Sequence, residues 1–243
     1  MRGLRGLPAG LIAGLIGGLA VALLVLAVAR PDQVRRVWHE VVIRLPRAPL
    51  PLPALREATP AAASLIAAAE GQVGVTTSYD PAYVRIAFPG GDVPRDTGVC
   101  TDVVVRALRD GLGVDLQAAM NRDMRGAFGA YPRLWGLARP DPNIDHRRVP
   151  NLEAFLRRMG AAISIPANLR DLQPGDIVTS GGGGRAPHVM IVTRRTSWDG
   201  MPLVVHNSGA GTRVNNALPV FTPRAVFRLE GAALARLRRL AGA

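Results

Sequence analysis

The hydrophobic pattern of the chain changes near Gly160, and this change restricts the fold to one in which helices precede a sheet. Before Gly160, apolar residues such as Val103, Val104 and Leu108 recur at helical spacing. After it, short apolar and β-branched runs are separated by Gly, Asn and Pro, which is typical of strands. Helices followed by strands predict an α+β domain in which helices pack on an antiparallel sheet.

Capping residues and terminators predict where the helices begin and end. Thr59 is an N-cap before Pro60, and this pair begins a helix that continues to about Glu70. A second helix begins at Cys100 and ends at Gly111 or Gly113. The other predicted helices cover residues 116–124, 151–160 with Asn151 as its cap, and the basic segment 231–243.

Four runs after Gly160 predict strands, at residues 176–180, 188–195, 202–208 and 225–230. A further short strand is predicted at Tyr83–Ala87, inside a stretch rich in turn-forming residues. The run Gly181–Gly184 has neither the strand-to-helix context nor the Lys of a phosphate loop. It therefore predicts a hairpin or lid between two strands.

An uncharged stretch of 23 residues, Leu7 to Ala29, lies near the N-terminus with arginines on both sides. A helix of this length spans the roughly 30 Å hydrocarbon core of a bilayer. Ala27-Val28-Ala29 also has the form of a signal-peptide cleavage site, but the apolar run exceeds the roughly 7–15 residues of a signal core. We expect residues 1–30 to be a membrane anchor, with a cleaved signal peptide as the alternative. Either one exports the rest of the chain.

Five prolines between Leu45 and Pro60 favour an extended, semi-rigid linker over residues 31–60. Residues 61–230 then form the domain, and residues 231–243 form a basic C-terminal helix or tail. The net charge of +12 lies mainly in residues 1–57 and 224–243, so the domain is nearly neutral. Because aromatic residues are few and no DNA-reading motif is present, we exclude nucleic acid as a partner. Basic ends favour an anionic membrane or cell wall.

Cys100 is the single cysteine of the chain, and it stands where a helix should begin. The helix N-terminus favours a thiolate, which is the nucleophilic form of the side chain. His188 and His206 lie on two predicted strands downstream. A cysteine at a helix start and two histidines on predicted strands indicate a nucleophilic site. The alternative is a buried structural thiol and two core histidines.

Two other uses of these residues are disfavoured. A single cysteine cannot form an intrachain disulfide. Zinc takes three or four ligands, and the chain has no CxxC or HExxH spacing, so a metal formed from Cys100, the histidines or Asp145 is disfavoured. We predict neither a metal nor another cofactor.

Several residues near the thiol or in the stretch DPNIDHRRVPNL are candidate substrate contacts. Arg147 or Arg148 could pair with a peptide carboxylate. For the others, a structural part in capping a helix or filling the core stays open. The candidates are Tyr83, Asp96, Asp102, Asp145, His146 and Arg147.

The blocks PGGDVPRDTGVCTDVVVRALRDGLGVDL, AYPRLWGLARPDPNIDHRRVPNL, LQPGDIVT, PHVMIV and VVHNSGAGT occur in this order between Ala61 and Leu229. They resemble a bacterial domain-of-unknown-function family, family 1287. Their order is also similar to that of the NlpC-type superfamily of papain-like cell-wall cysteine peptidases and amidases. The resemblance implies a papain-like fold of helices packed on an antiparallel sheet.

The resemblance also implies a role for each residue of the site. Cys100 matches the nucleophile, His188 the general base and His206 the polar group that orients the imidazole. Asn207 is the alternative orienter if the strand register turns His206 to the other face. Main-chain N–H groups at the helix start, that of Cys100 included, would stabilise an oxyanion. One departure is Val99, which precedes the nucleophile where many relatives carry Asp.

Three functions follow as hypotheses. The first is a cell-envelope cysteine hydrolase that cleaves amide bonds, with peptidoglycan stem peptides as substrate and an acyl-enzyme intermediate. The second is a non-catalytic papain-like module that binds the wall or another protein. The third is acyl transfer by the same three residues. The sequence does not indicate an oligomeric state.

Overall fold

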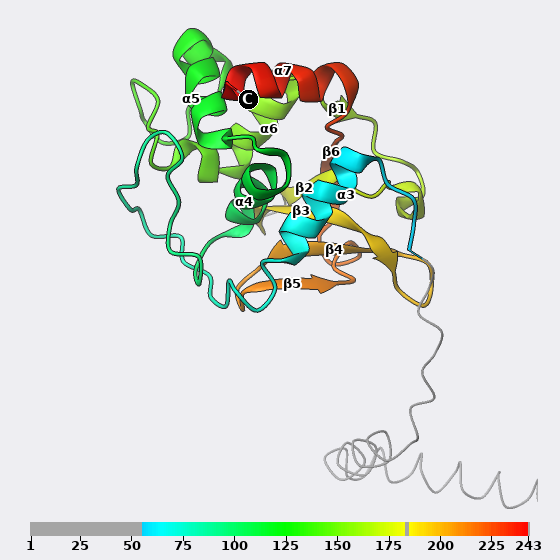
Figure 1. The fold of residues 1–243 in the computed structure, drawn as a ribbon. Coiled ribbons are helices and arrows are strands. Elements are labelled where there is room, and N and C mark those ends of the chain that lie inside the picture. The colour runs from blue at the N-terminus through cyan, green and yellow to red at the C-terminus, as the bar shows by residue number, and fades with distance from the viewer. Residues whose placement is uncertain (1–54, 183–184, 243) are drawn as a thin grey trace, which may run out of the picture. The chain divides into compact units, whose positions relative to one another are not determined.

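Helices occupy the first half of the described chain and strands occupy most of the second half, as the sequence pattern predicts (Figure 1). The computed structural model describes residues 55–182 and 185–242. Within these ranges it is an α+β structure in which helices gather on one face of a six-stranded antiparallel sheet. The helices are α3 (Pro60–Glu70), α4 (Cys100–Leu112), α5 (Leu116–Ala127), α6 (Val149–Arg158) and α7 (Gly231–Ala241).

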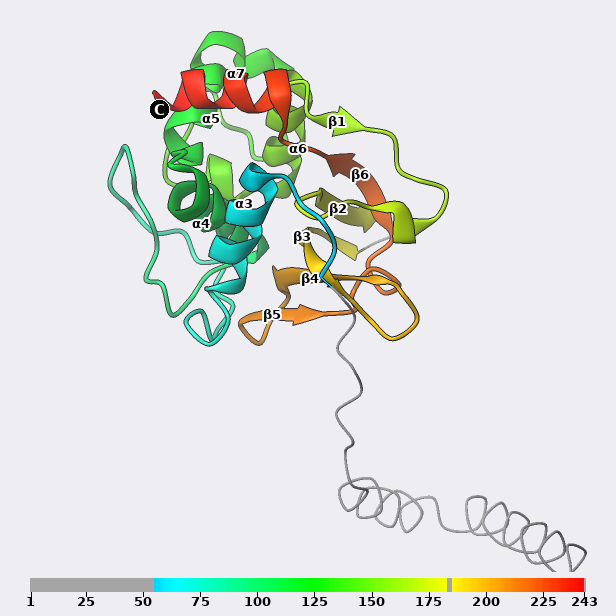
Figure 2. The ribbon, with the colours of Figure 1, turned by 45° about the vertical axis from the view of Figure 1, so that its right-hand side comes forward.

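The strand order in the sheet is β1-β6-β2-β3-β4-β5, and all pairs are antiparallel (Figure 2). Strands β2, β3, β4 and β6 confirm the four strands predicted after Gly160. Two short strands, β1 and β5, lie at the edges of the sheet and were not predicted. The bounds are β1 (Ala162–Ile163), β2 (Ile177–Gly182), β3 (Arg185–Thr196), β4 (Pro202–Asn207), β5 (Thr212–Asn215) and β6 (Pro223–Phe227).

Local caps explain most helix boundaries. The Thr59 side chain accepts a hydrogen bond from the main-chain N–H of Ala62, and Gly113 ends α4 in the left-handed conformation with φ of 66°. The predicted cap at Asn151 is wrong. Helix α6 begins two residues earlier, at Val149, because Pro150 fits the first helical turn.

The predicted strand at Tyr83–Ala87 is also wrong, because this segment has no neighbouring strand. It is held by side chains instead: the main-chain N–H of Ile86 donates to Asn143 Oδ1 at 3.0 Å, and the Tyr83 hydroxyl contacts Asp141. The segment therefore crosses the surface as an ordered loop close to the start of α4.

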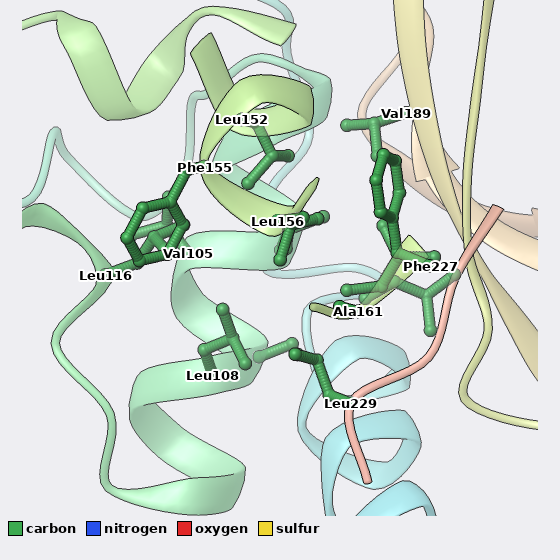
Figure 3. Packing of buried hydrophobic residues seen from close by; sticks show 14 of the residues in the cluster. Val105, Leu108, Leu116, Leu152, Phe155, Leu156, Ala161, Val189, Phe227 and Leu229 are labelled. Atoms are coloured by element: carbon green, nitrogen blue, oxygen red, sulfur yellow. The ribbon is translucent and has the colours of Figure 1, made fainter. Parts of the chain in front are cut away.

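The sheet separates two apolar clusters. On the helix side, Val189, Ile191 and Val205 pack with residues of α3 to α7. On the other side, Met190, Val192 and Val204 pack with the segment around Leu218. Figure 3 shows Val189 and Phe227 extending from the sheet toward Leu152 and Leu156 of α6. Successive residues of β3 thus face opposite sides, and this alternation decides where the site residues point.

Within the described ranges, no helix is long and apolar enough to cross a bilayer. The predicted membrane segment Leu7–Ala29 and most of the proline-rich linker lie outside the described residues.

Candidate active site

Cys100 is the first residue of α4 and lies buried against the start of β3. The main-chain N–H of Val189 and the hydroxyl of Tyr79 donate hydrogen bonds to its sulfur. The helix that carries the cysteine therefore meets the strand that carries His188 at the residue next to that histidine.

Burial raises the pKa of the Cys100 thiol to about 11, although hydrogen bonds from Val189, Thr101 and Tyr79 act in the opposite direction. The expectation that the helix N-terminus favours a thiolate is wrong for this structure, because lost hydration outweighs the hydrogen bonds that favour the thiolate. The pKa of Tyr79 is raised to about 12 by burial and by the neighbouring Cys100, so its hydroxyl stays protonated. At neutral pH the nucleophile candidate is a thiol that accepts hydrogen bonds.

Asp102 and Arg147 form a buried ion pair beside Cys100. Arg147 Nε donates to Asp102 Oδ1 at 2.9 Å, and Arg147 Nη2 donates to Asp102 Oδ2 at 3.0 Å. The Arg147 guanidinium also donates to the main-chain carbonyls of Asp80 and Ala82. Asp102 also accepts the Val99 main-chain N–H at 2.6 Å. The pair thus fixes the start of α4 and holds the 80–82 segment over it.

His188, His206 and Asn215 form a hydrogen-bonded relay across three strands. His188 Nε2 lies 2.8 Å from His206 Nδ1, and His206 Nε2 lies 2.9 Å from Asn215 Oδ1. With Asn215 Oδ1 as the acceptor, His206 Nε2 carries a proton and His206 Nδ1 accepts from His188 Nε2. Within the described residues, this order leaves the lone pair of His188 Nδ1 without a hydrogen bond.

Both histidines of the relay are neutral at pH 7. Burial, and then His206, lowers the pKa of His188 to about 3. Burial also lowers the pKa of His206, although the Asn215 hydrogen bond opposes this effect. A neutral imidazole is the form that can accept a proton, and a pKa of about 3 makes His188 a weak base in this geometry.

Strand alternation places the relay and the sulfur on different faces of the sheet. Val189 packs on the helix side with Cys100, whereas the His188 ring stacks on Phe221, 4.4 Å between centroids, on the other side. Among the described residues, no hydrogen bond joins the Cys100 sulfur to the His188 ring. The sulfur instead meets the β3 main chain at Val189, next to His188.

Asn207 lies on the helix side of β4, and among the described residues its side chain makes no hydrogen bond to either histidine ring. Its Nδ2 group donates to the main-chain carbonyls of Ser78 and Gly98, both at 3.0 Å. These bonds tie β4 to the segment that leads into Cys100. The register keeps His206 beside His188, so the place considered for Asn207 as alternative orienter is taken by His206 in this structure.

A cavity of about 540 Å³ opens beside Cys100. Its walls come from the 79–83 loop, the start of α4, the 134–135 loop and the 144–150 segment, with Pro187 from β3. The lining residues are Tyr79, Pro81, Tyr83, Val99, Cys100, Leu134, Trp135, Ile144, Arg147, Arg148, Val149, Pro150 and Pro187. A cavity of this size is sufficient for a small ligand or a peptide segment.

Residues 66–229 match the model of a domain of unknown function, DUF1287. The chain belongs to this family. It is also 48% identical over 150 residues to the uncharacterized protein YijF of Escherichia coli (strain K12), an alignment that covers 62% of this chain and 73% of the relative. The matched residues of this DUF1287 domain include Cys100, His188, His206 and the cavity walls.

The six predicted substrate contacts of this DUF1287 domain have different surroundings. Tyr83 and Arg147 line the cavity. The Asp102 carboxylate is occupied by its ion pair with Arg147. His146 is buried away from the cavity lining, where burial lowers its pKa to about 4. Asp145 is buried and accepts hydrogen bonds from Asp141, Arg148 and Asn151, which hold the 141–148 loop.

Among the described residues, the hydrogen bonds of Asp96 are those of its main-chain carbonyl, which accepts from Thr77 and Ser78. Residue spacing alone did not indicate Asn215, because its contact with His206 arises from the pairing of β4 with β5. Trp135 also lines the cavity, with its ring under the Arg148 guanidinium. Among the described residues, no three His, Cys, Asp or Glu side chains are grouped as metal ligands would be.

Proposed function

We propose that this chain is a cell-envelope cysteine hydrolase that cleaves amide bonds, with peptidoglycan stem peptides as its substrate class. The observation that carries the proposal is the relay of His188, His206 and Asn215, which begins one residue from the Val189 N–H that contacts the Cys100 sulfur. A cavity beside that sulfur supplies space for a substrate. The order of nucleophile, base and orienter follows that of papain-like enzymes.

In the proposed reaction, the Cys100 thiol gives its proton to His188 Nδ1 as the sulfur attacks the amide carbonyl. In this structure the His188 ring lies on the other face of the sheet from the sulfur. This transfer therefore requires the ring to move around the N-terminal end of β3. The imidazolium then gives the proton to the leaving amine, and a thioester remains on Cys100. Water, deprotonated by His188, hydrolyses the thioester and restores the thiol.

The start of α4 offers a donor for the oxyanion of this reaction. The first N–H groups of a helix have no intrahelical acceptor. Within the described residues, the Cys100 main-chain N–H has no hydrogen-bond acceptor. It is therefore free to donate to a carbonyl oxygen whose carbon is attacked by the adjacent sulfur.

His206 acts in this proposal as a positioning residue. By accepting from His188 Nε2, it fixes the tautomer that presents Nδ1, and it stabilises the charged ring when His188 takes the proton. Asn215 fixes the tautomer of His206 in the same way. A papain-like fold, a membrane anchor at residues 7–29 and a periplasmic or otherwise external position of the domain complete the proposal.

A second candidate function is a non-catalytic module that binds the cell wall or a protein. The raised pKa of Cys100 and the position of His188 on the other face of the sheet favour it. In the hydrolase, Cys100 is acylated and then restored in each turnover. In the binding module, Cys100 does not react.

Incubation of the purified protein with muropeptides separates these two functions. We expect new amino groups to be released by the wild type, and the rate to fall to background in Cys100→Ala. A Cys100→Ala rate equal to that of the wild type removes the nucleophile. If the wild type binds muropeptides and releases no amines, the binding module is the function.

A further inference from the structure

The cavity beside Cys100 has positively charged side chains in its lining, each paired with a carboxylate that lies outside the lining. Two arginines, Arg147 and Arg148, line it, and its lining within the described residues includes no Asp or Glu. Most of the other lining residues are apolar or aromatic. A cavity of this composition favours an occupant that carries a negative charge on a largely apolar body.

Arg147 is not available for that charge. Its guanidinium is occupied by Asp102 and by the carbonyls of Asp80 and Ala82, and the side chain is almost fully buried. This pairing holds a loop in place, and Asp102 neutralises the charge of the Arg147 guanidinium.

Arg148 retains free donors. Its Nη1 donates to Asp145 Oδ1 at 3.0 Å, and within the described residues its Nε and Nη2 groups have no partner. The guanidinium lies over the Trp135 ring, 4.1 Å from the centroid. The Asp145 contact and the stacking contact together fix the plane of the guanidinium. An arginine held in this way presents its remaining N–H groups in the geometry that suits a carboxylate.

We propose that Arg148 binds a carboxylate of an anionic peptide substrate, while an amide carbonyl of the same peptide lies at Cys100. The inference rests on the proposed function, because it assigns the substrate class of the same cavity. The Trp135 ring and the neighbouring Leu134 contact the apolar part of the peptide. Arg148 is thus a specificity residue and takes no part in proton transfer.

A binding measurement tests this inference separately from turnover. The full-length protein carrying Cys100→Ala is titrated calorimetrically with the stem tripeptide alanyl-γ-glutamyl-diaminopimelate. A second titration uses the same peptide with its carboxylates converted to amides. We expect the carboxylate form to bind at least about 10-fold more tightly, since a hydrogen-bonded charge pair contributes on this scale.

Arg148→Gln should weaken binding of the carboxylate peptide by about 10- to 100-fold and leave binding of the amidated peptide unchanged. Arg148→Lys keeps the charge but loses the planar fork, so an intermediate loss is expected. This variant also keeps the test valid if Arg148→Gln is unstable. Arg239→Gln removes the same charge from an exposed position on α7 and should leave both affinities unchanged.

Equal binding of the two peptides, binding of neither, or unchanged affinity in both Arg148 variants would overturn the inference. Amine release that depends on Cys100 while KM is unchanged in both Arg148 variants also overturns it and leaves the hydrolase standing. Carboxylate binding that depends on Arg148, without amine release by the wild type, supports the inference and removes the hydrolase.

Discussion

The two groups of residues that make up the candidate site lie on opposite faces of the sheet and are held by different forces. The helix wall, formed by the start of α4 and the loops on it, is fixed by buried charges: Arg147 pairs with Asp102, and Arg106 pairs with Asp92 and also donates to loop carbonyls. The sheet wall, formed by His188, His206 and Asn215, is held by hydrogen bonds between groups that are neutral at pH 7. The fixed charges hold the nucleophile in place, whereas the neutral relay can accept a proton.

This difference predicts which group of residues contributes more to stability and which contributes more to activity. Removing one partner of a buried ion pair leaves an uncompensated charge in the interior, which costs about 3–5 kcal/mol. Replacing a neutral hydrogen-bonded group costs about 0.5–1.5 kcal/mol. Substitutions on the helix wall should therefore lower stability first, and substitutions on the sheet wall should lower activity first.

The largest expected effect on activity is that of His188→Gln. Because the amide cannot accept the thiol proton, we expect kcat/KM for amine release to fall by about 10²- to 10⁴-fold. The thermal unfolding midpoint, measured by circular dichroism, should change little by comparison. A His188→Gln enzyme that retains wild-type kcat/KM would show that the sheet wall has no part in the chemistry.

The largest expected effect on stability is that of Asp102→Asn. The substitution leaves the Arg147 guanidinium buried without its counter-ion, so the free energy of unfolding should fall by about 3–5 kcal/mol in urea titrations. The double variant Asp102→Asn, Arg147→Met removes both charges and should recover part of the loss. If Asp102→Asn is as stable as the wild type, charge does not hold the helix wall.

A smaller effect per residue is expected from pH. His146, His188 and His206 have lowered pKa values in the folded chain, so below pH 6.5 the unfolded chain binds protons that the folded chain does not. The free energy of unfolding should therefore fall as the pH drops from 6.5 toward 4, by up to about 1.4 kcal/mol per pH unit for each histidine. Asp110, whose pKa Arg95 holds below its usual range, stays charged in this window.

Urea titrations at about pH 7.5 and about pH 5 measure this dependence. His188→Asn should make it shallower, because one of the three neutral histidines is then absent. Equal stability of the wild type at both pH values would contradict the lowered pKa values of the buried histidines.

The sequence predicted the features that depend on neighbouring residues. Thr59 with Pro60 located the start of α3, Gly113 the end of α4, and the runs after Gly160 four of the strands. The segment Tyr83–Ala87 was predicted as a strand from composition, yet a strand requires a partner, and here Asn143 takes the hydrogen bond instead. Edge strands β1 and β5 are too short to give a periodic signal.

The sequence predicted which residue types form the site and their order along the chain. It did not predict their contacts or their protonation states. The pairing of β3 with β4 brings His206 to His188, and the pairing of β4 with β5 adds Asn215; neither follows from spacing alone. The state of Cys100 was predicted from the local helix dipole, whereas burial of the thiol decides it. The free donors of Arg148 appear only once Arg147 is seen to pair with Asp102.

The most direct test of a catalytic Cys100 is intact-protein mass spectrometry of the wild type, quenched in acid during turnover of muropeptides. A thioester adduct on Cys100, with the mass of the acyl part of the substrate, is expected in the wild type. The adduct should be absent in Cys100→Ala and strongly reduced in His188→Gln. Amine release without any adduct on Cys100, or an adduct that forms equally fast in His188→Gln, would contradict a Cys100 nucleophile whose proton is accepted by His188.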